Sequence, residues 1–167
     1  GDSRGTLMRH CLLATSFVLL VGAGAFAQTQ TRLFEPEVGQ GGKDVVWVPT
    51  PPALVEKMLD MARVTRDDLV MDLGSGDGRN IMAAAKRGAR AIGVEYNPDM
   101  VALSTRLAAA AGVADRASFV EGDMFTADIS KATVMALFLL PANLEKLRET
   151  FLALAPGTRL VMNTFDI

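Results

Sequence analysis

Hydrophobic and polar positions along this chain alternate between the spacing of a buried strand and the spacing of a one-sided helix. Short apolar runs predict strands at residues 69–73, 91–95, 118–121, 133–140 and 159–165. Between these runs, apolar residues recur at helical spacing and predict helices over residues 53–64, 78–88, 98–112 and 142–155. Thr50 is expected to cap the first helix, with Pro51 at its first position.

The predicted strands are apolar along most of their length, without a regular polar face. Strands of this kind are buried on both sides, as in a parallel sheet covered by helices. Because strands and helices alternate and crossovers are right-handed, we predict a doubly wound α/β domain with a mostly parallel sheet and helices on both faces. Ligands in such folds bind at the carboxyl ends of the strands.

The first residues carry a separate signal. From Met8 the chain has a short basic start, an apolar run and then Ala25-Phe26-Ala27 before Gln28. This predicts a secretory signal peptide within residues 1–27, and hence export to the periplasm or cell envelope. The alternative is an uncleaved membrane anchor over residues 8–27. Residues 28–44 are polar and Gly-rich and predict a flexible lead-in to the domain at 45–167.

The composition excludes several classes of partner and catalytic site. The net charge is −2 and no basic block occurs, so a nucleic-acid partner is not expected. His10 and Cys11, the only histidine and cysteine of the sequence, both fall in the predicted leader. A mature chain without them has no Cys-His nucleophile, no histidine base and no typical zinc site, so we predict no bound metal.

The stretch MDLGSGDGRN at residues 71–80 follows the first predicted strand and bears the candidate chemistry. It lacks the Gly-Lys-Ser/Thr of a P-loop, and Arg79 stands where a dinucleotide fingerprint needs its third glycine. Asp72 and Asp77 would repel a pyrophosphate and favour a ligand with positive charge. Gly74, Gly76 and Gly78 would let that ligand approach bare backbone.

Two further acids stand at the ends of the next strands. Glu95 ends the second predicted strand, about 20 residues after the glycine turn, where a carboxylate can accept from both ribose hydroxyls. Asp123 follows the third strand, where it can accept from an adenine amino group. Because Asp72, Glu95 and Asp123 lie at three successive strand ends, they predict a site for S-adenosylmethionine, a cationic nucleoside without phosphate.

These residues resemble the class I methyltransferases: D-x-G-x-G-x-G, the acid after the second strand, and Gly-Asp after the third. The segments WVPTPPALVEKML, GVEYNPDM and TVMALFLLPANLEKLR further resemble the small protein-lysine methyltransferases, which include the archaeal broad-specificity enzymes and the ATP synthase c-subunit lysine methyltransferase family. The resemblance covers residues 45–167 and implies S-adenosylmethionine as cofactor. The cofactor-binding residues that it implies are Thr50, Asp72, Gly74, Gly76, Asp77, Gly78, Glu95, Tyr96, Asn97, Asp123 and Met124.

Within that resemblance, Trp47 and Thr50 belong to a segment over the cofactor, and Met124 joins Asp123 at the adenine. Phe138-Leu139-Leu140-Pro141 replaces the N-P-P-Y of many amide and nucleic-acid amino methyltransferases. An apolar exit suits an amine that is already nucleophilic, so Phe138, Leu139 and Leu140 are candidate acceptor-channel residues; plain strand core is the alternative. The expected reaction is N-methylation of a lysine in a protein.

Other functions stay open at this point. A small-molecule methyltransferase of the same fold, a cofactor-binding module without turnover and a nicotinamide oxidoreductase are the alternatives. The related enzymes continue with an antiparallel strand pair after the fifth strand, whereas this chain stops at Ile167. We therefore expect the C-terminal strand pair to be missing and the domain to be truncated, because a bare apolar edge strand favours unwanted pairing.

Overall fold

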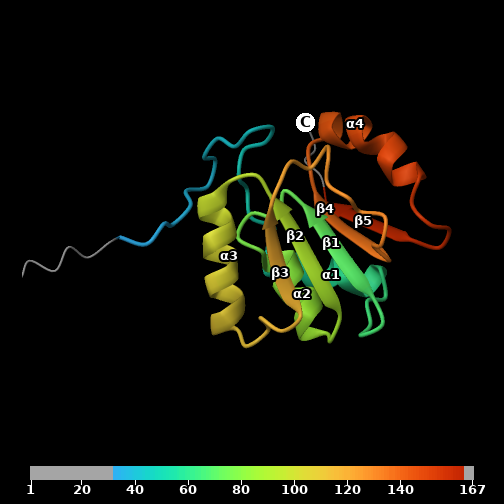
Figure 1. Ribbon diagram of the computed structural model, residues 1–167, viewed down its shortest axis with the longest axis horizontal. Helices are drawn as coiled ribbons and strands as arrows, with labels where there is room; N and C mark the ends of the chain where they lie inside the picture. Colours follow the sequence, from blue (N-terminus) through green and yellow to red (C-terminus); the bar gives the residue numbers. More distant parts are fainter. Residues whose placement is uncertain (1–31, 164–167) are drawn as a thin grey trace, which may run out of the picture. The chain divides into compact units, whose positions relative to one another are not determined.

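The computed structural model describes residues 32–163 (Figure 1). The predicted leader at 1–27, the start of the lead-in and the end of the last predicted strand therefore lie outside the described residues. The elements follow in the order α1 Pro52–Met61, β1 Leu69–Leu73, α2 Arg79–Lys86, β2 Arg90–Glu95, α3 Pro98–Ala110, β3 Ala117–Glu121, β4 Val134–Phe138, α4 Pro141–Leu152 and β5 Arg159–Asn163.

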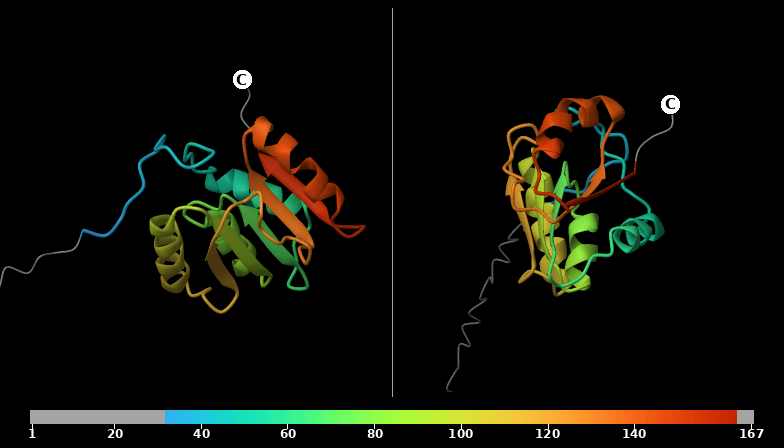
Figure 2. Two further views of the ribbon diagram at one scale, coloured as in Figure 1. Left: turned by 45° about the horizontal axis from the view of Figure 1, so that its top comes forward. Right: turned by 90° about the vertical axis from the view of Figure 1, so that its right-hand side faces the viewer.

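The five strands form one parallel sheet in the order β3-β2-β1-β4-β5. The chain runs outward from β1 to β3 and then returns to β4 beside β1, so the direction of winding changes between β1 and β4 (Figure 2). Ligands bind at such a switch point in open α/β sheets. The predicted doubly wound α/β fold is confirmed.

Two apolar layers cover the faces of the sheet. On one face Val70 and Val134 pack with Leu59 of α1 and Ile81 of α2. On the other face the residues of β1 and β4 that alternate with them, together with Leu147 of α4, form the second layer. Because successive strand side chains point to opposite faces, a strand buried on both faces must be apolar throughout. This explains the continuous apolar runs of the sequence.

The starts of α3 and α4 carry ordinary helix-start residues, whereas the start of α1 departs from its prediction. Asn97 caps α3 through its side-chain oxygen, which accepts from the Asp99 N–H at 2.9 Å, and Pro141 begins α4. The prediction that Thr50 caps α1 is wrong, because Pro51 is the cap residue and makes no side-chain bond. The Thr50 carbonyl instead accepts from Arg79 at the glycine turn.

The base of the sheet, at the amino ends of the strands, is held by a buried acid. Asp68 is 7% exposed, ion-pairs with Arg159 of β5 and accepts from the Thr133 hydroxyl at 2.8 Å. Burial favours its neutral form, but the donors of Thr65, Thr133 and Arg159 together lower the pKa of Asp68. These contacts connect the residue just before β1 with the starts of β4 and β5. They lie at the end of the sheet opposite the glycine turn.

Among residues 32–163, no helix has the length and apolar content needed to cross a membrane. β5 is the last strand of the described sheet, and Leu160 and Met162 on it are 38% and 42% exposed.

Candidate functional site

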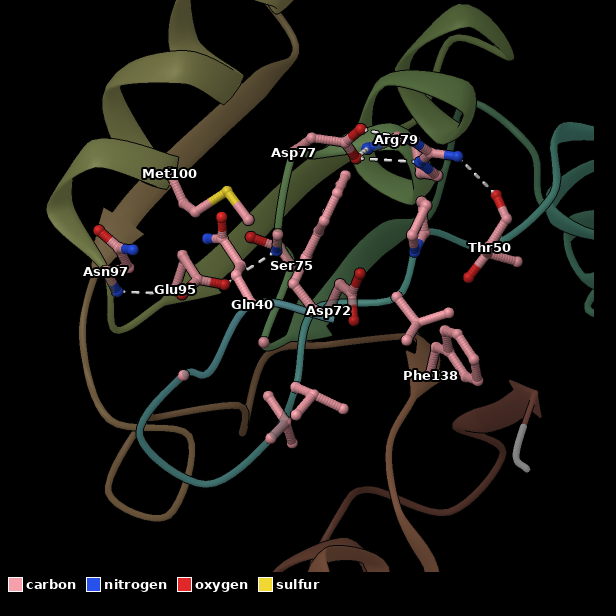
Figure 3. A pocket seen from close by; sticks show the side chains of 18 of the residues that line it. Gln40, Thr50, Asp72, Ser75, Asp77, Arg79, Glu95, Asn97, Met100 and Phe138 are labelled. Carbon is pink, nitrogen blue, oxygen red and sulfur yellow. Dashed lines mark hydrogen bonds and ion pairs between the residues drawn. The ribbon is translucent and has the colours of Figure 1, made fainter. Parts of the chain in front are cut away.

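A cavity lies at the carboxyl ends of β1, β2 and β4 (Figure 3). Its walls come from residues 40–50, from the glycine turn between β1 and α2, and from the strand ends. The polar and charged side chains that line it are Gln40, Trp47, Thr50, Asp72, Ser75, Asp77, Arg79, Asn80, Glu95 and Asn97. Three of its four charged groups are carboxylates, so the cavity as a whole favours a cationic ligand.

The glycine turn needs its glycines for backbone shape and for close approach. Gly74, Gly76 and Gly78 have positive φ angles of 73°, 56° and 81°, which residues with side chains rarely adopt. A Cβ at Gly76 would lie 2.7 Å from Nε1 of Trp47, and one at Gly78 would lie 2.5 Å from the Phe119 ring. Gly76 therefore brings the backbone against the covering segment, while Gly78 lets α2 pack against β3.

Asp72 forms the floor of the cavity and is 2% exposed. Its Oδ2 accepts from the Asn80 side-chain amide at 3.0 Å, and its Oδ1 has no partner among the described residues. Burial raises the pKa of Asp72 to about 8, and the nearby Glu95 carboxylate adds to this rise, while the Asn80 hydrogen bond opposes it. At neutral pH this carboxyl group therefore ionises fully only beside a positive charge.

Glu95 stands at the end of β2 with its carboxylate fixed by two backbone donors. Oε2 accepts from the Gly76 N–H at 2.9 Å and Oε1 from the Asn97 N–H at 3.0 Å. A carboxylate oxygen can accept more than one hydrogen bond. Glu95 therefore joins the glycine turn to the start of α3 and still has acceptor capacity for a hydroxyl-bearing ligand.

Asp77 is engaged by Arg79 rather than held open for a ligand. Its Oδ2 lies 2.6 Å from Nη2 of Arg79, and its Oδ1 accepts from Nε at 3.0 Å. Nη1 of the same guanidinium donates to the Thr50 carbonyl at 2.8 Å. The sequence prediction that Asp77 offsets a ligand's positive charge therefore needs revision, because an internal arginine already neutralises this acid.

Residues 39–50, here called the strap, cover the strand ends. The Gly39 N–H donates to the Trp47 carbonyl at 2.8 Å and the Trp47 N–H to the Gln40 carbonyl at 2.9 Å, so the strap folds back on itself. The Asn143 amide of α4 donates to the Asp44 carbonyl at 3.2 Å. Residues 39–44, predicted to be part of a flexible lead-in, are thus hydrogen-bonded within the domain.

A second cavity lies between the strap and the ends of β2 and β3. Asp123 lines it and accepts from the Lys43 ammonium at 2.8 Å and from the Phe125 N–H at 2.9 Å. The hydrogen bond from Lys43 is the main cause that lowers the pKa of Asp123. The Lys43 ammonium also lies 5.2 Å from the centre of the Tyr96 ring, so the strap is held at this end by its own cation.

The candidate acceptor residues divide between cavity and core. Phe138 and Leu140, at the end of β4, line the first cavity. Leu139 is 1% exposed and belongs to the core under α4, and a Cβ on Gly74 would lie 3.6 Å from it. The strand-core alternative thus describes Leu139, while its two neighbours border the cavity.

The structure brings most of the predicted site residues together. The first cavity takes Thr50, Asp72, Gly74, Gly76, Asp77, Glu95, Asn97, Phe138 and Leu140. The second takes Tyr96, Asp123 and Met124, and it shares Gly74, Glu95 and Asn97 with the first. Gly78 and Leu139 line neither and act through packing.

Sequence reasoning missed several polar residues that the structure places at the site, among them Lys43, Ser75, Arg79 and Asn80. Only Asn80 carried a detectable signal. It lies on the inward face of α2, where Ile81, Ala84 and Ala85 are apolar and buried. A polar residue in such a position indicates a buried polar contact.

The polar atoms on the cavity floor fit S-adenosylmethionine. Within the described residues, Asp72 Oδ1, Ser75 Oγ and Asn80 Oδ1 are buried without hydrogen-bond partners, and all three residues line the cavity. Buried polar atoms are rarely left unpaired, so a ligand with polar and cationic groups would satisfy them. These residues would hold the methionine part of the cofactor, Glu95 the ribose and Asp123 with Met124 the adenine.

Over residues 32–163, no group of three or more His, Cys, Asp or Glu side chains is placed to hold a metal ion. The acids of the site are separated by the glycine turn, the strap and the strand ends on which they stand.

Comparison with known proteins places this site in a family. Residues 72–167 match the model of the ANTKMT methyltransferase domain. The chain is 44% identical over 126 residues to a protein-lysine N-methyltransferase of Saccharolobus islandicus, covering 74% of this chain and 78% of that protein. It is 36% identical over 120 residues to the ATP synthase c-subunit lysine N-methyltransferase of Mus musculus, covering 71% of this chain and 48% of that one.

A solved structure is similar in both sequence and fold. It is the RNA methyltransferase from Salinibacter ruber in complex with S-adenosyl-L-homocysteine, 47% identical with a TM-score of 0.68, covering 71% of this chain and 79% of that chain. The chain thus spans most of the Saccharolobus and Salinibacter proteins but about half of the mouse relative. The chain belongs to the ANTKMT methyltransferase domain family, whose cofactor is S-adenosylmethionine.

Proposed function

We propose that this protein transfers the methyl group of S-adenosylmethionine to the side-chain amine of lysine in a protein. Two kinds of support converge on lysine. The relatives from Saccharolobus islandicus and mouse are both named as lysine N-methyltransferases. The acceptor end of the cavity is apolar, and an amine needs no polar clamp to become nucleophilic, whereas an amide or a base does.

The observation that carries the proposal is the contrast between two neighbouring strand ends in one cavity. Asp72, on the floor, presents a carboxyl oxygen without a partner among the described residues. Phe138 and Leu140, at the end of the adjacent strand β4, present hydrocarbon. The first strand end thus suits the charged part of the cofactor, and the second suits an acceptor that must lose its water and its charge.

S-adenosylmethionine supplies an electrophilic methyl group that an amine nitrogen can take while the sulfonium becomes a neutral thioether. The chain contributes position and environment. Glu95 and the glycine turn would hold one reactant against bare backbone, and the strap forms another wall of the same cavity. Well-held reactants can gain roughly 7–11 kcal/mol from proximity and orientation.

The acceptor nitrogen must be uncharged before it can attack. An apolar exit lined by Phe138 and Leu140 lowers the pKa of an entering ammonium because it removes the water that stabilises the charge. The proton leaves to solvent before methyl transfer, and no side-chain base is needed. This agrees with a sequence in which residues 28–167 contain neither histidine nor cysteine.

RNA is a second candidate acceptor, because the similar Salinibacter structure bears the name of an RNA methyltransferase. The charges of this chain oppose it. The net charge is −2, and among the described residues that line the first cavity the one cationic side chain, Arg79, is already paired with Asp77. A polyanion would be repelled at this entrance, since nucleic-acid affinity depends mainly on neutralised phosphates.

We further propose that residues 8–27 direct export of the chain, or hold it at a membrane if they are not cleaved. The supporting pattern is the basic start, the apolar run and Ala25-Phe26-Ala27.

Expression with the leader should give a periplasmic chain that begins at Gln28, as read by N-terminal sequencing. Ala27→Arg should block cleavage because the peptidase requires a small residue there. A full-length wild-type chain in the soluble cytosolic fraction would refute export.

Glu95→Gln should weaken binding of S-adenosylhomocysteine at least about tenfold, because a charged acceptor is replaced by a group that offers one acceptor and one donor. Titration calorimetry measures the dissociation constant, with melting temperature as the check on folding. Glu121→Gln is the matched control, since Glu121 pairs with Glu95 in the strand register but is exposed. Equal losses of affinity in the two variants would show that Glu95 does not bind the cofactor.

Lys43→Met should speed dissociation of S-adenosylhomocysteine about two- to fivefold at low salt, because the substitution removes an exposed ion pair that holds the strap to Asp123. Stopped-flow displacement measures the rate, and high salt should abolish the difference by screening the pair. Lys146→Met is the control: its ammonium lies over the Phe125 ring at 5.4 Å. Slower dissociation in Lys43→Met would mean instead that Lys43 competes with the cofactor for Asp123.

Tritiated S-adenosylmethionine should label unfolded casein at lysine, because the apolar exit favours a neutral amine. Mass spectrometry after hydrolysis should identify N-methyllysine, and casein with its lysines reductively dimethylated should take up far less label. Parallel reactions contain free lysine or total RNA. Label in RNA alone would favour the second acceptor class, label in free lysine alone a small-molecule enzyme, and cofactor binding without any transfer a non-catalytic module.

A further inference from the structure

Asn80 is a polar residue on a helix face that is otherwise apolar and buried. It lies in the first turn of α2 and is 4% exposed, on the helix face whose other buried members are Ile81, Ala84 and Ala85. Burial of an amide is unfavourable unless its groups are hydrogen-bonded. Asn80 meets that condition on one side only, because its Oδ1 is buried without a partner in the part of the chain described.

The amide nitrogen of Asn80 donates to a residue on the cavity floor. Nδ2 donates to Oδ2 of Asp72 at 3.0 Å and lies 3.5 Å from the Ala136 carbonyl, a weak contact. The first bond fixes which carboxyl oxygen of Asp72 is occupied and leaves Oδ1 unpaired within residues 32–163. Two unpaired acceptor oxygens, one from each residue, therefore belong to a single hydrogen-bonded pair that lines the cavity.

We propose that Asn80 is a positioning residue of the cofactor site. Its amide nitrogen holds the Asp72 carboxyl group in place, so that the unpaired oxygens of both side chains accept from the ammonium of the cofactor's methionine part. The inference rests on the cofactor identified above and does not depend on the acceptor. Ser75, whose hydroxyl is buried and also unpaired among the described residues, borders the same floor.

Electrostatics gives Asn80 a second effect through Asp72. The charged groups at this cavity besides Asp72 are Glu95, Asp77 and Arg79, and Arg79 is paired with Asp77. Burial raises the pKa of Asp72, Glu95 and Asp77 raise it further, and the amide of Asn80 opposes both. Loss of the amide should therefore make Asp72 harder to ionise and weaken its attraction for a cation.

The test compares two adenosine ligands that differ in the methionine part. Asn80→Leu keeps the side-chain size but loses the amide. It should weaken S-adenosylhomocysteine about tenfold or more in calorimetry, while methylthioadenosine, which lacks the ammonium and carboxylate, should change less than about twofold. Ser104→Ala is the control for loss of a buried polar group, since the Ser104 hydroxyl donates to the Val101 carbonyl within α3.

A second readout follows the proton. Asp72 is largely neutral below its pKa of about 8 in the free protein, so binding of a cation at pH 7 should release close to one proton. Calorimetry in buffers of different ionisation enthalpy measures this release. In the wild type the release should decline as pH rises through 8, and in Asn80→Leu the decline should move to higher pH.

The outcomes separate the possibilities. Equal weakening of both ligands, or an unchanged pH of proton release, would overturn the positioning role and leave Asn80 as packing. Failure of the wild type to bind S-adenosylhomocysteine would instead overturn the cofactor assignment. If Asn80→Leu does not fold, Asn80→Asp keeps the shape but loses the donor and places a second carboxyl beside Asp72. It should raise the pH of proton release in the same way.

Discussion

Burial of the Asp72 carboxyl group at the end of the central strand is the constraint on which the site depends. A carboxylate that is 2% exposed is costly to ionise, and among the described residues the side-chain donor that it receives is the Asn80 amide. Two neighbouring contacts position the backbone around this acid without neutralising it: Glu95 accepts from the glycine turn, and Arg79 pairs with Asp77. A cationic ligand supplies the compensating charge, so the floor of the cavity is suited to the cofactor by its buried acid.

The strap covers the carboxyl ends of the strands and forms one wall of the site. Arg79 holds it at the Thr50 carbonyl, Asn143 at Asp44, and Lys43 at Asp123. The first two contacts use backbone carbonyls, while the third uses the acid expected to accept from adenine. In the proposed site the strap and the cofactor would share the Asp123 carboxylate, which would link closure over the adenine to its binding.

Chemistry in this cavity depends on environment more than on reactive side chains. In the proposed reaction, the apolar side chains of Phe138 and Leu140 would remove water from the acceptor, and an ionised Asp72 would stabilise the cationic part of the cofactor. Methyl would pass from a sulfonium, which is already electrophilic, to an amine that becomes nucleophilic once it is neutral. The protein then needs only to hold the two reactants, exclude water and favour the uncharged form of the amine.

The sequence by itself determined the fold class and the acids at the strand ends, because continuous apolar runs require burial on both faces and parallel strands bring their carboxyl ends to one edge. Asp72, Glu95 and Asp123 could thus be placed by position alone. Only the tertiary structure decided how each group is used: Asp77 is neutralised by Arg79, Leu139 belongs to the core, Lys43 reaches Asp123 across 80 positions, and Asn80 bonds Asp72. The reason is that periodicity reports which face a residue takes, whereas pairing depends on which side chains of distant segments meet.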